Sequence, residues 1–329
     1  MGNMNVIYRP EDLPHGCPRP VATVGNFDGI HLGHQQLIKF LVGRAREIGG
    51  TATVITFNPH PLAVLAPNNA PRQIQTLAQK LERMRVLGIR LAIVIPFSLP
   101  FAQTKAREFV TEYLWRRFQI YEIYAGPNFA FGHRREGSFN LLKEVGEERG
   151  FFVGKVHQVQ FRGARVSSTS VRQALVSGQV GLARRLLARP FTLTGEIVHG
   201  SALGGGNRIP TANLRHENEL VPRIGVYVTM LSVEGRRYRS VSNIGIRPTV
   251  TAGESDPVVT IETHALDFDG NLYGARVSLE FLVRLREEKR FPNMNSLVAQ
   301  ITRDIARARR YFDWLERCAP ALLSPPSAS

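Results

Sequence analysis

The stretch that decides the fold is Val21-Ala-Thr-Val-Gly-Asn-Phe-Asp-Gly-Ile-His-Leu-Gly-His34. Its first four residues are apolar or β-branched, which predicts a short buried strand. Gly25, Gly29 and Gly33 then permit a tight turn and a close approach of the backbone to a ligand. A helix that begins after such a turn offers free N–H donors and the positive end of its dipole to phosphate. We therefore expect a phosphate-binding turn that joins a strand to a helix.

Similar alternations of short apolar runs and helical segments continue to about Leu187, which is typical of a parallel sheet with helices on its faces. The expected strands are residues 21–24, 51–57, 91–96, 120–125 and 151–159. The expected helices are residues 35–48, 77–87, 106–117 and 141–149. Because ligands bind beyond the carboxyl ends of parallel strands, the loops after the first, second and fourth strands are the places to look for a site.

After Pro190 the pattern changes to glycine-rich turns between short alternating runs, which predicts an antiparallel barrel or sandwich. The expected strands are residues 192–198, 225–233, 238–243, 258–266 and 276–283. One helix closes the chain, because apolar residues recur there at helical spacing and should cover the sheet. They are Leu297, Ile301, Ile305, Ala308 and Phe312.

His31 and His34 are the first candidates for chemistry. Three residues apart, they fall on one face of the opening helical turn, where two imidazoles can donate hydrogen bonds to phosphate oxygens as charge builds up in a displacement. A histidine pair at this spacing is more often structural, but its place after a strand and among glycines favours a functional interpretation.

Three further segments stand out. Thr56-Phe-Asn-Pro-His-Pro61 follows the second strand, and its two prolines indicate a rigid loop that projects His60. Gly126-Pro-Asn-Phe-Ala-Phe-Gly132 follows the fourth strand, and its two Phe rings suit either stacking on a planar ligand or a place in the core. Ser167-Ser-Thr-Ser-Val-Arg172 carries more hydroxyls than a helix cap needs, so it can also cradle pyrophosphate, while Ser170 and Gln173 fit a capping box.

These segments, in this order, resemble the bacterial bifunctional riboflavin kinase/FAD synthetase family over nearly the entire chain. The resemblance implies a Rossmann-like nucleotidyltransferase domain with a parallel sheet at residues 1–187 and a kinase domain at residues 188–320, built as an antiparallel β-barrel with a closing helix. The α/β plus β fold class agrees with the strand and helix patterns above. Residues 321–329, small, polar and rich in proline, are expected to form a disordered tail.

The first domain of that family transfers AMP from ATP to FMN and releases FAD and pyrophosphate. The resemblance implies that His31 and His34 bind the ATP phosphates and that Arg172 helps to hold the departing pyrophosphate. It also assigns nucleotide binding to the glycine-rich turn and the serine-rich segment, and the flavin side to the loop after the second strand. The nucleotide-binding residues are Gly25, Phe27, Asp28, Gly29, Gly33, Asn128, Ser167, Ser168 and Thr169. The flavin-side residues are Asn58, Pro59, His60 and Pro61, with Asn58 at a position where many members carry Asp.

The second domain of the family phosphorylates riboflavin with ATP. Pro210-Thr-Ala-Asn213 resembles its PTAN motif, which implies that Thr211 and Asn213 hold Mg²⁺ and nucleotide phosphates, although read alone they are turn residues. Glu262 falls at the position of the general base that takes a proton from the ribityl hydroxyl. Arg284, Arg286 and Phe291 lie in a stretch like the flavin-side segment of the kinase.

One departure from the family pattern leaves an alternative open. Members have Gly-Arg-x-x-Gly before PTAN, whereas this chain has Gly204-Gly-Gly-Asn-Arg-Ile209, with Gly205 in place of Arg and Arg208 in place of Gly. Arg208 either blocks the approach of the nucleotide or supplies the missing charge from a new position. The alternative is a FAD synthetase whose barrel is inactive as a kinase.

Composition and charge exclude several other classes of protein. The formal net charge is +15, but six of the 42 basic residues are Lys, the others are Arg, and they spread along the chain, which favours a solvated surface over nucleic-acid binding. Two distant cysteines indicate neither a disulfide framework nor a zinc site, and no run of apolar residues predicts a membrane span. We expect a cytosolic enzyme with riboflavin, FMN and ATP as substrates, Mg²⁺ as cofactor, and flavin as substrate and product.

Overall fold

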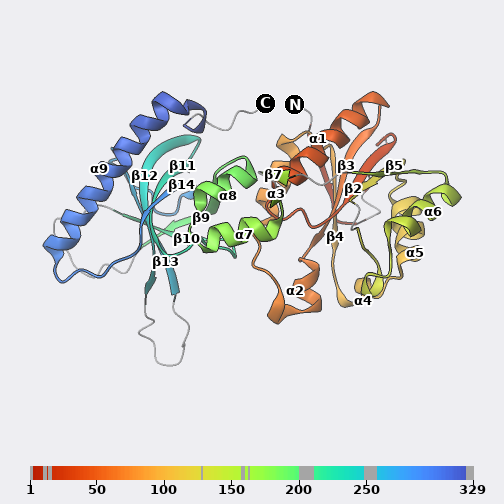
Figure 1. Ribbon diagram of the computed structural model, residues 1–329, viewed down its shortest axis with the longest axis horizontal. Coiled ribbons are helices and arrows are strands. Elements are labelled where there is room, and N and C mark those ends of the chain that lie inside the picture. The colour runs from red at the N-terminus through yellow and green to blue at the C-terminus, as the bar shows by residue number, and fades with distance from the viewer. Residues whose placement is uncertain are drawn as a thin grey trace. The chain divides into compact units, whose positions relative to one another are not determined.

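The computed structural model describes residues 3–9, 13, 17–126, 129–156, 160–161, 164–199, 211–247 and 258–323. Contacts divide the chain into two compact units, residues 1–167 and 168–328 (Figure 1). The first unit contains a parallel sheet with helices, and the second contains an antiparallel barrel with helices, so the predicted α/β plus β fold class is confirmed.

A six-stranded parallel sheet forms the first unit. Its strands are β1 (Asn5–Ile7), β2 (Pro20–Val24), β3 (Thr51–Asn58), β4 (Leu91–Pro96), β5 (Glu122–Ala125) and β6 (Phe152–Lys155). They lie in the order β1-β4-β3-β2-β5-β6, so the chain runs outward from β2 through β3 and β4 on one side, and through β5 and β6 on the other. The order therefore reverses between β2 and β5, which is where open sheets of this kind bind ligands.

Helices cover both faces of this sheet, as the near-continuous apolar strands require. The helices are α1 (Leu32–Glu47), α2 (Pro61–Leu65), α3 (Leu77–Val86), α4 (Leu99–Ala102), α5 (Ala106–Glu108) and α6 (Phe139–Arg149), with short 3₁₀ turns η2 (Pro67–Asn69) and η4 (His133–Arg135). Neighbouring residues of β3 alternate between two cores: Val54 packs with α1 and α3, whereas Ile55 packs with the segment after α5 and with α6.

That segment, η3 (Phe109–Arg117), is a π-helix that continues α5 and occupies the predicted helix at residues 106–117. The N–H of Phe118 donates to the carbonyl oxygen of Tyr113, five residues earlier, at 2.9 Å. Val110 and Leu114 are fully buried against the sheet. The amphipathic pattern was thus predicted correctly, but its hydrogen-bond register was not.

A closed antiparallel barrel forms the core of the second unit. Its strands are β9 (Phe191–Val198), β10 (Ala212–His216), β11 (Gly225–Val233), β12 (Arg236–Arg247), β13 (Val258–Ala265) and β14 (Arg276–Arg286). They follow the order β10-β13-β12-β11-β14-β9, and β9 also pairs with β10, which leaves no open edge. The sequence predicted five of these strands and missed β10, because the PTAN residues resemble a turn.

Helix α9 (Met294–Cys318) covers the outside of the barrel. Ala308, Phe312 and Leu315 are fully buried against β11, whereas Leu297 and Ile301 of the predicted stripe are only half-buried. The 3₁₀ turn η5 (Pro320–Leu322) follows α9, and residues 324–329 of the predicted tail lie outside the described residues.

Two shorter helices, α7 (Ser168–Val176) and α8 (Val180–Leu187), belong to the second unit. Helix α8 packs on β14 and β9, and the N–H of Arg223 donates to the carbonyl oxygen of Leu175 at 3.0 Å. Because α7 begins at Ser168, Ser170 lies inside the helix, and its predicted role as the N-cap of a capping box is wrong. A two-stranded ribbon of β7 (Gln160–Phe161) and β8 (Ala164–Arg165) precedes α7.

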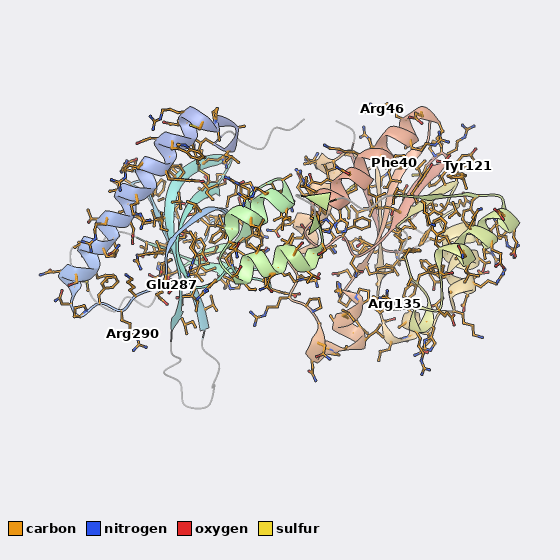
Figure 2. The ribbon with its side chains drawn as sticks, in the orientation of Figure 1. Phe40, Arg46, Tyr121, Arg135, Glu287 and Arg290 are labelled. Carbon is orange, nitrogen blue, oxygen red and sulfur yellow. The ribbon has the colours of Figure 1, made fainter. Side chains whose placement is uncertain are left out.

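Both units carry exposed basic residues. Figure 2 labels Arg46 on α1, Arg135 in η4 and Arg290 between β14 and α9, and all three side chains are exposed. Several other arginines form exposed ion pairs, such as Arg309 with Asp267. Such pairs contribute little to stability individually, so a scattered arginine surface agrees with the distribution seen in the sequence.

Gly132 allows a stringent test of the first unit. It has φ 74° and ψ 179°, a region adopted almost only by glycine, and an added Cβ would lie 2.5 Å from Cα of Ala106. We expect Gly132→Ala to lower the free energy of unfolding by roughly 3 kcal/mol, measured by urea unfolding. Gly150 is the matched control, because its φ is 78° but a Cβ there meets no neighbour, so Gly150→Ala should cost about 1–2 kcal/mol. Equal losses would contradict the steric argument.

Candidate active sites

The glycine-rich turn leaves β2 at the edge where the strand order reverses. The N–H of Gly25 donates to the carbonyl oxygen of Ile55 at 3.0 Å, which ties the turn to β3. Positive φ occurs at Phe27 (49°), Gly29 (81°) and Ile30 (38°), so the backbone is tightly curled. Two of these residues are not glycine, and such conformations persist only where surrounding contacts hold them.

Asp28 supplies one of those contacts. Its carboxylate is 1% exposed, and the N–H of Ile74 donates to both oxygens, at 3.0 and 3.2 Å. Ile74 lies just before α3, so this contact fixes the turn against that helix. Asp28 was predicted to bind nucleotide; the structure shows an anchoring role, and a nucleotide contact stays a prediction.

The two imidazoles come together as the spacing predicted. His31 is the N-cap of α1, and its Nδ1 accepts a hydrogen bond from the N–H of His34 at 3.4 Å. The rings stack with centroids 3.8 Å apart and planes inclined by 16°. Because Nδ1 of His31 is an acceptor, the proton of the neutral ring sits on Nε2, which is then a donor.

His34 is held in its neutral form. Burial, followed by the positive field of His31 and Lys80, lowers the pKa of His34 well below its ordinary range. Its Nδ1 is buried without a hydrogen-bond partner among the described residues. Phe27 lies against the ring, with centroids 5.0 Å apart. A neutral imidazole of this kind can act as a hydrogen-bond donor through Nε2.

Lys80 and Arg83 of α3 are cationic residues that the sequence interpretation missed. Lys80 is buried, and burial lowers its pKa while nearby Asp28 raises it. Arg83 donates to the side-chain oxygen of Gln35 at 3.4 Å, and Gln35 donates to the carbonyl oxygen of Ile30 at 2.8 Å. Two cationic side chains therefore lie next to the glycine-rich turn. The spacing of residues along α3 did not predict that they would be there.

The loop after β3 lies beside the glycine-rich turn. The Asn58–Pro59 peptide bond is cis, and His60 is the N-cap of α2, with Nδ1 accepting from the N–H of Leu62 at 3.2 Å. His60 Nε2 lies 3.0 Å from the side-chain amide nitrogen of Asn26. Two motifs far apart in the sequence therefore share one edge of the sheet, although the flavin-side roles of Asn58, Pro59, His60 and Pro61 stay predictions.

The aromatic segment after β5 packs within the unit. Phe129 and Phe131 stack on each other with centroids 5.0 Å apart, and both pack into the core that contains Phe109. This favours the core interpretation, above all for Phe131, which is 8% exposed. Asn128 lies outside the described residues.

The serine-rich segment straddles the boundary between the units. Ser167 ends the first unit, whereas Ser168, Thr169 and Arg172 occupy the first turns of α7 in the second. All four carry side chains suited to phosphate, but their predicted juxtaposition with His31 and His34 stays a prediction.

In the barrel, three polar residues form a row across neighbouring strands. Asn213 on β10 pairs with Glu262 on β13, and Glu262 pairs with Asn243 on β12. Residues directly opposite in a sheet have Cβ atoms about 4.5–5.5 Å apart, so the three polar side chains of this Asn–Glu–Asn row leave the sheet side by side on one face. Next to it, a Cβ on Gly245 would lie 2.4 Å from Oε1 of Glu288, so the missing side chain makes room for that carboxylate.

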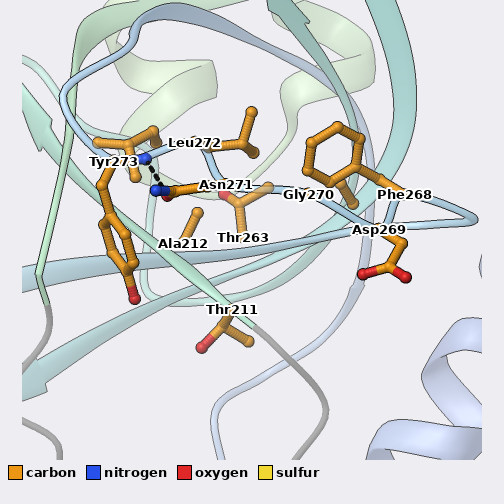
Figure 3. A pocket seen from close by; sticks show the side chains of 11 residues that line it. Thr211, Ala212, Thr263, Phe268, Asp269, Gly270, Asn271, Leu272 and Tyr273 are labelled. Carbon is orange, nitrogen blue, oxygen red and sulfur yellow. Dashed lines mark hydrogen bonds between the residues drawn. The ribbon is translucent and has the colours of Figure 1, made fainter.

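A pocket of about 130 Å³ opens at one mouth of the barrel (Figure 3). It is lined by Ile197, Thr211, Ala212, Thr263, Ala265 and the loop of residues 268–273. In that loop the side chain of Asn271 accepts from the N–H of Tyr273 at 2.9 Å. Thr211, predicted from the PTAN motif, therefore borders a cavity, while Gly205 and Arg208 lie outside the described residues.

The predicted flavin-side residues of the kinase make strong contacts with the protein. Arg286 binds the buried carboxylate of Asp304 on α9 through Nε at 2.9 Å and Nη2 at 2.8 Å, and its guanidinium lies 5.8 Å from the ring centroid of Phe291. Arg284 donates to the carbonyl oxygen of Ile224 at 2.6 Å. These contacts give both arginines a structural role in the second unit. Their roles in binding flavin stay predictions.

A sheet with paired imidazoles at its reversal point, together with a closed barrel that carries an Asn–Glu–Asn row, indicates a two-unit enzyme of phosphate transfer. A family model for FAD synthetase matches residues 15–170, and one for riboflavin kinase matches residues 187–312. The bifunctional riboflavin kinase/FMN adenylyltransferase of Pseudomonas fluorescens is 38% identical over 301 residues, covering 92% of this chain and 94% of that protein. The one from Escherichia coli K12 is 35% identical, covering 94% and 96%.

The chain therefore belongs to the bifunctional riboflavin kinase/FMN adenylyltransferase family. A crystal structure from Streptococcus pneumoniae, described as a macrolide-efflux protein, is 29% identical with a TM-score of 0.82 and covers 93% of this chain and 98% of its own. Its similarity supports the fold. Among the described residues no helix has the length and apolar character needed to cross a membrane.

The effect of the positive charge of Lys80 on the pKa of His34 can be measured. Because a nearby positive charge disfavours protonation, we expect Lys80→Met to raise the pKa of His34, followed by NMR titration of the imidazole. In the unmodified protein His34 should stay neutral where ordinary histidines, with pKa about 6.5, become protonated, so stability is lost as the pH falls through that value. Lys39→Met, at an exposed position of α1, is the control and should leave the titration unchanged. An unaltered pKa in Lys80→Met would exclude this interaction.

Proposed function

We propose that the chain makes both FMN and FAD: the barrel unit phosphorylates riboflavin with ATP, and the parallel-sheet unit transfers AMP from a second ATP to FMN and releases pyrophosphate. The observation that carries this proposal is that each unit matches one of the two family models while retaining its polar residues. The His31–His34 stack lies in one unit and the Asn213–Glu262–Asn243 row in the other.

For adenylyl transfer, the phosphate of FMN attacks the α-phosphorus of ATP, and the bond to pyrophosphate breaks. No covalent enzyme intermediate is needed, so the work of the protein is positioning and stabilisation of charge. His34, which is neutral, and His31, whose Nδ1 accepts from the N–H of His34, donate hydrogen bonds to phosphate oxygens through Nε2. Ser168, Thr169 and Arg172 hold the departing pyrophosphate.

For the kinase reaction, the ribityl hydroxyl attacks the γ-phosphorus of ATP, and the bond between the γ-phosphorus and ADP breaks, so that FMN and ADP are released. Glu262 takes the proton of that hydroxyl. Asn213 and Asn243 lie opposite Glu262 on the two neighbouring strands. The barrel-mouth pocket takes the nucleotide, because Thr211 of the PTAN motif lies in its lining.

The oxygen donors of the barrel fit Mg²⁺. Thr211 offers a hydroxyl and Asn213 an amide oxygen, both hard ligands that this ion accepts. The described residues contain no group of three or more His, Cys, Asp or Glu side chains able to hold a metal, so water and nucleotide phosphates would complete the coordination. When bound, Mg²⁺ neutralises the developing charge on the phosphates. A cytosolic location stays a prediction.

Product analysis by mass tests both activities in one preparation. Supplied with riboflavin, ATP and Mg²⁺, the protein should form FMN and then FAD, and with FMN it should form FAD directly. FAD from FMN without any FMN from riboflavin would support the alternative of an inactive barrel, whose motive is the altered loop at residues 204–209. The absence of both products would refute the proposal.

Two substitutions should separate the activities. We expect His34→Ala to slow FAD formation from FMN by about 10²–10³, the usual effect of losing one transition-state donor, while FMN formation continues. Glu262→Gln should have the opposite pattern, because it removes a base but keeps the size of the side chain. Each variant is thus the control for the other, and a loss of both activities in either one would indicate a folding defect, which circular dichroism would detect.

A further inference from the structure

Four hydroxyl groups form a continuous chain inside the barrel. Thr229 Oγ1 lies 2.8 Å from Ser240 Oγ and 2.8 Å from Ser242 Oγ, and Ser242 Oγ lies 2.8 Å from Thr263 Oγ1. Three of these residues are completely buried, and Thr263 is 2% exposed. Nothing in the proposed chemistry of the Asn–Glu–Asn row uses these hydroxyls.

The chain crosses the barrel on its inner face. Thr229 of β11 pairs with Ser240 of β12, and Ser242 of β12 pairs with Thr263 of β13, so the hydroxyls step from strand to strand. Side chains alternate along a strand, which places Thr263 inside and its neighbour Glu262 outside. At the β13 end the chain reaches the barrel-mouth pocket, because Thr263 belongs to the lining (Figure 3).

The number of protons determines in which direction the hydrogen bonds of the hydroxyl chain run. Four hydroxyls carry four protons, and three hydrogen bonds use three of them, so one proton remains. Ser240 and Thr263 are the ends of the chain, and each of these two hydroxyls has one hydrogen-bond partner among the described residues, whereas Thr229 and Ser242 have two. A proton left at Ser240, Thr229 or Ser242, all fully buried, would have no acceptor among the described residues, which costs about 1–3 kcal/mol. Hydrogen bonds therefore run from Ser240 toward Thr263, and the remaining O–H belongs to Thr263.

We propose that this hydroxyl chain fixes Thr263 as a hydrogen-bond donor into the barrel-mouth pocket, where Thr263 selects a nucleotide by an acceptor atom on its base. The inference rests on the proposed kinase function. Thr263 is a specificity-determining residue that contacts the nucleotide, and Ser242 is a positioning residue that acts through it.

The lining of the pocket favours the base over the phosphates. Among the described lining residues there is no Lys or Arg, and the one ionised side chain is Asp269, which repels phosphate. Apolar groups from Ile197, Ala212, Phe268 and Leu272 make up much of the remaining wall. An apolar cavity of about 150 Å³ accepts a benzene ring, so a volume of about 130 Å³ suits an uncharged aromatic ring.

The test uses the full-length chain and the rate of FMN formation from riboflavin. Thr263→Val keeps the shape of the side chain and removes the donor, so we expect the KM for ATP to rise about three- to tenfold with little change in kcat. Ser242→Ala should raise the same KM by a smaller factor, because the Thr263 hydroxyl is present but no longer oriented. Ser278→Ala, which removes a hydroxyl of β14 outside the chain, is the control and should leave the KM unchanged.

The identity of the acceptor follows from ATP analogues in which N1, N3 or N7 of the base is replaced by carbon. One analogue should raise the KM of the unmodified protein by about the same factor as Thr263→Val, and should cause no further rise in that variant. If Thr263→Val and the unmodified protein lose affinity equally with all three analogues, the hydroxyl does not contact a ring nitrogen and the proposal fails.

Folding effects and failure of the kinase assignment are distinguishable. FAD formation from FMN uses the other unit, so it should be unchanged in every variant. Lower melting temperatures in Thr263→Val and Ser242→Ala with an unchanged KM for ATP would mean that the chain is structural only, which overturns the inference and leaves the kinase function standing. If the unmodified protein forms no FMN, the proposed kinase function and this inference fall together.

Discussion

The buried carboxylate of Asp28 is the contact on which the first site depends. It accepts hydrogen bonds from the N–H of Ile74 and thereby stabilises a turn in which Phe27 and Ile30 adopt positive φ. Without that anchor the relaxed backbone would favour ordinary conformations, because each strained residue costs about 1–3 kcal/mol. The same carboxylate requires a positive neighbour in a buried setting, which Lys80 provides. The positive charge of Lys80, which compensates Asp28 in the turn, therefore also lowers the pKa of His34.

The barrel separates two kinds of chemistry by strand alternation alone. Glu262 and Thr263 are adjacent on β13, yet one faces the outer row of amides and the other the inner chain of hydroxyls. A small barrel is normally filled with apolar side chains, so a chain of four buried hydroxyls must satisfy itself internally. Its one surplus proton can be accommodated only where the interior opens, and this makes the composition of the barrel core relevant to the pocket at its mouth.

Much of the architecture was readable from the sequence because periodicity reports burial. The alternation of residues 21–187 predicted the parallel sheet, and the glycine-rich texture after Pro190 predicted the barrel. Periodicity did not predict two strands. Strand β1 is only three residues long and is defined by its pairing with β4. Strand β10 carries PTAN residues that also suit a turn. Such strands exist because a neighbour pairs with them, and a single sequence does not display its neighbours.

The site was predictable to a smaller extent, and for a similar reason. The spacing of His31 and His34 brings their rings together, because His31 caps α1 and His34 lies in its first turn. By contrast, Lys80 looked like any surface lysine of an amphipathic helix, and only the packing of α3 against the turn buries it beside Asp28. Local spacing determines contacts within an element, whereas the charges that tune a site arrive from elements that approach in three dimensions. Residues such as Lys80 therefore become visible only when the fold is known.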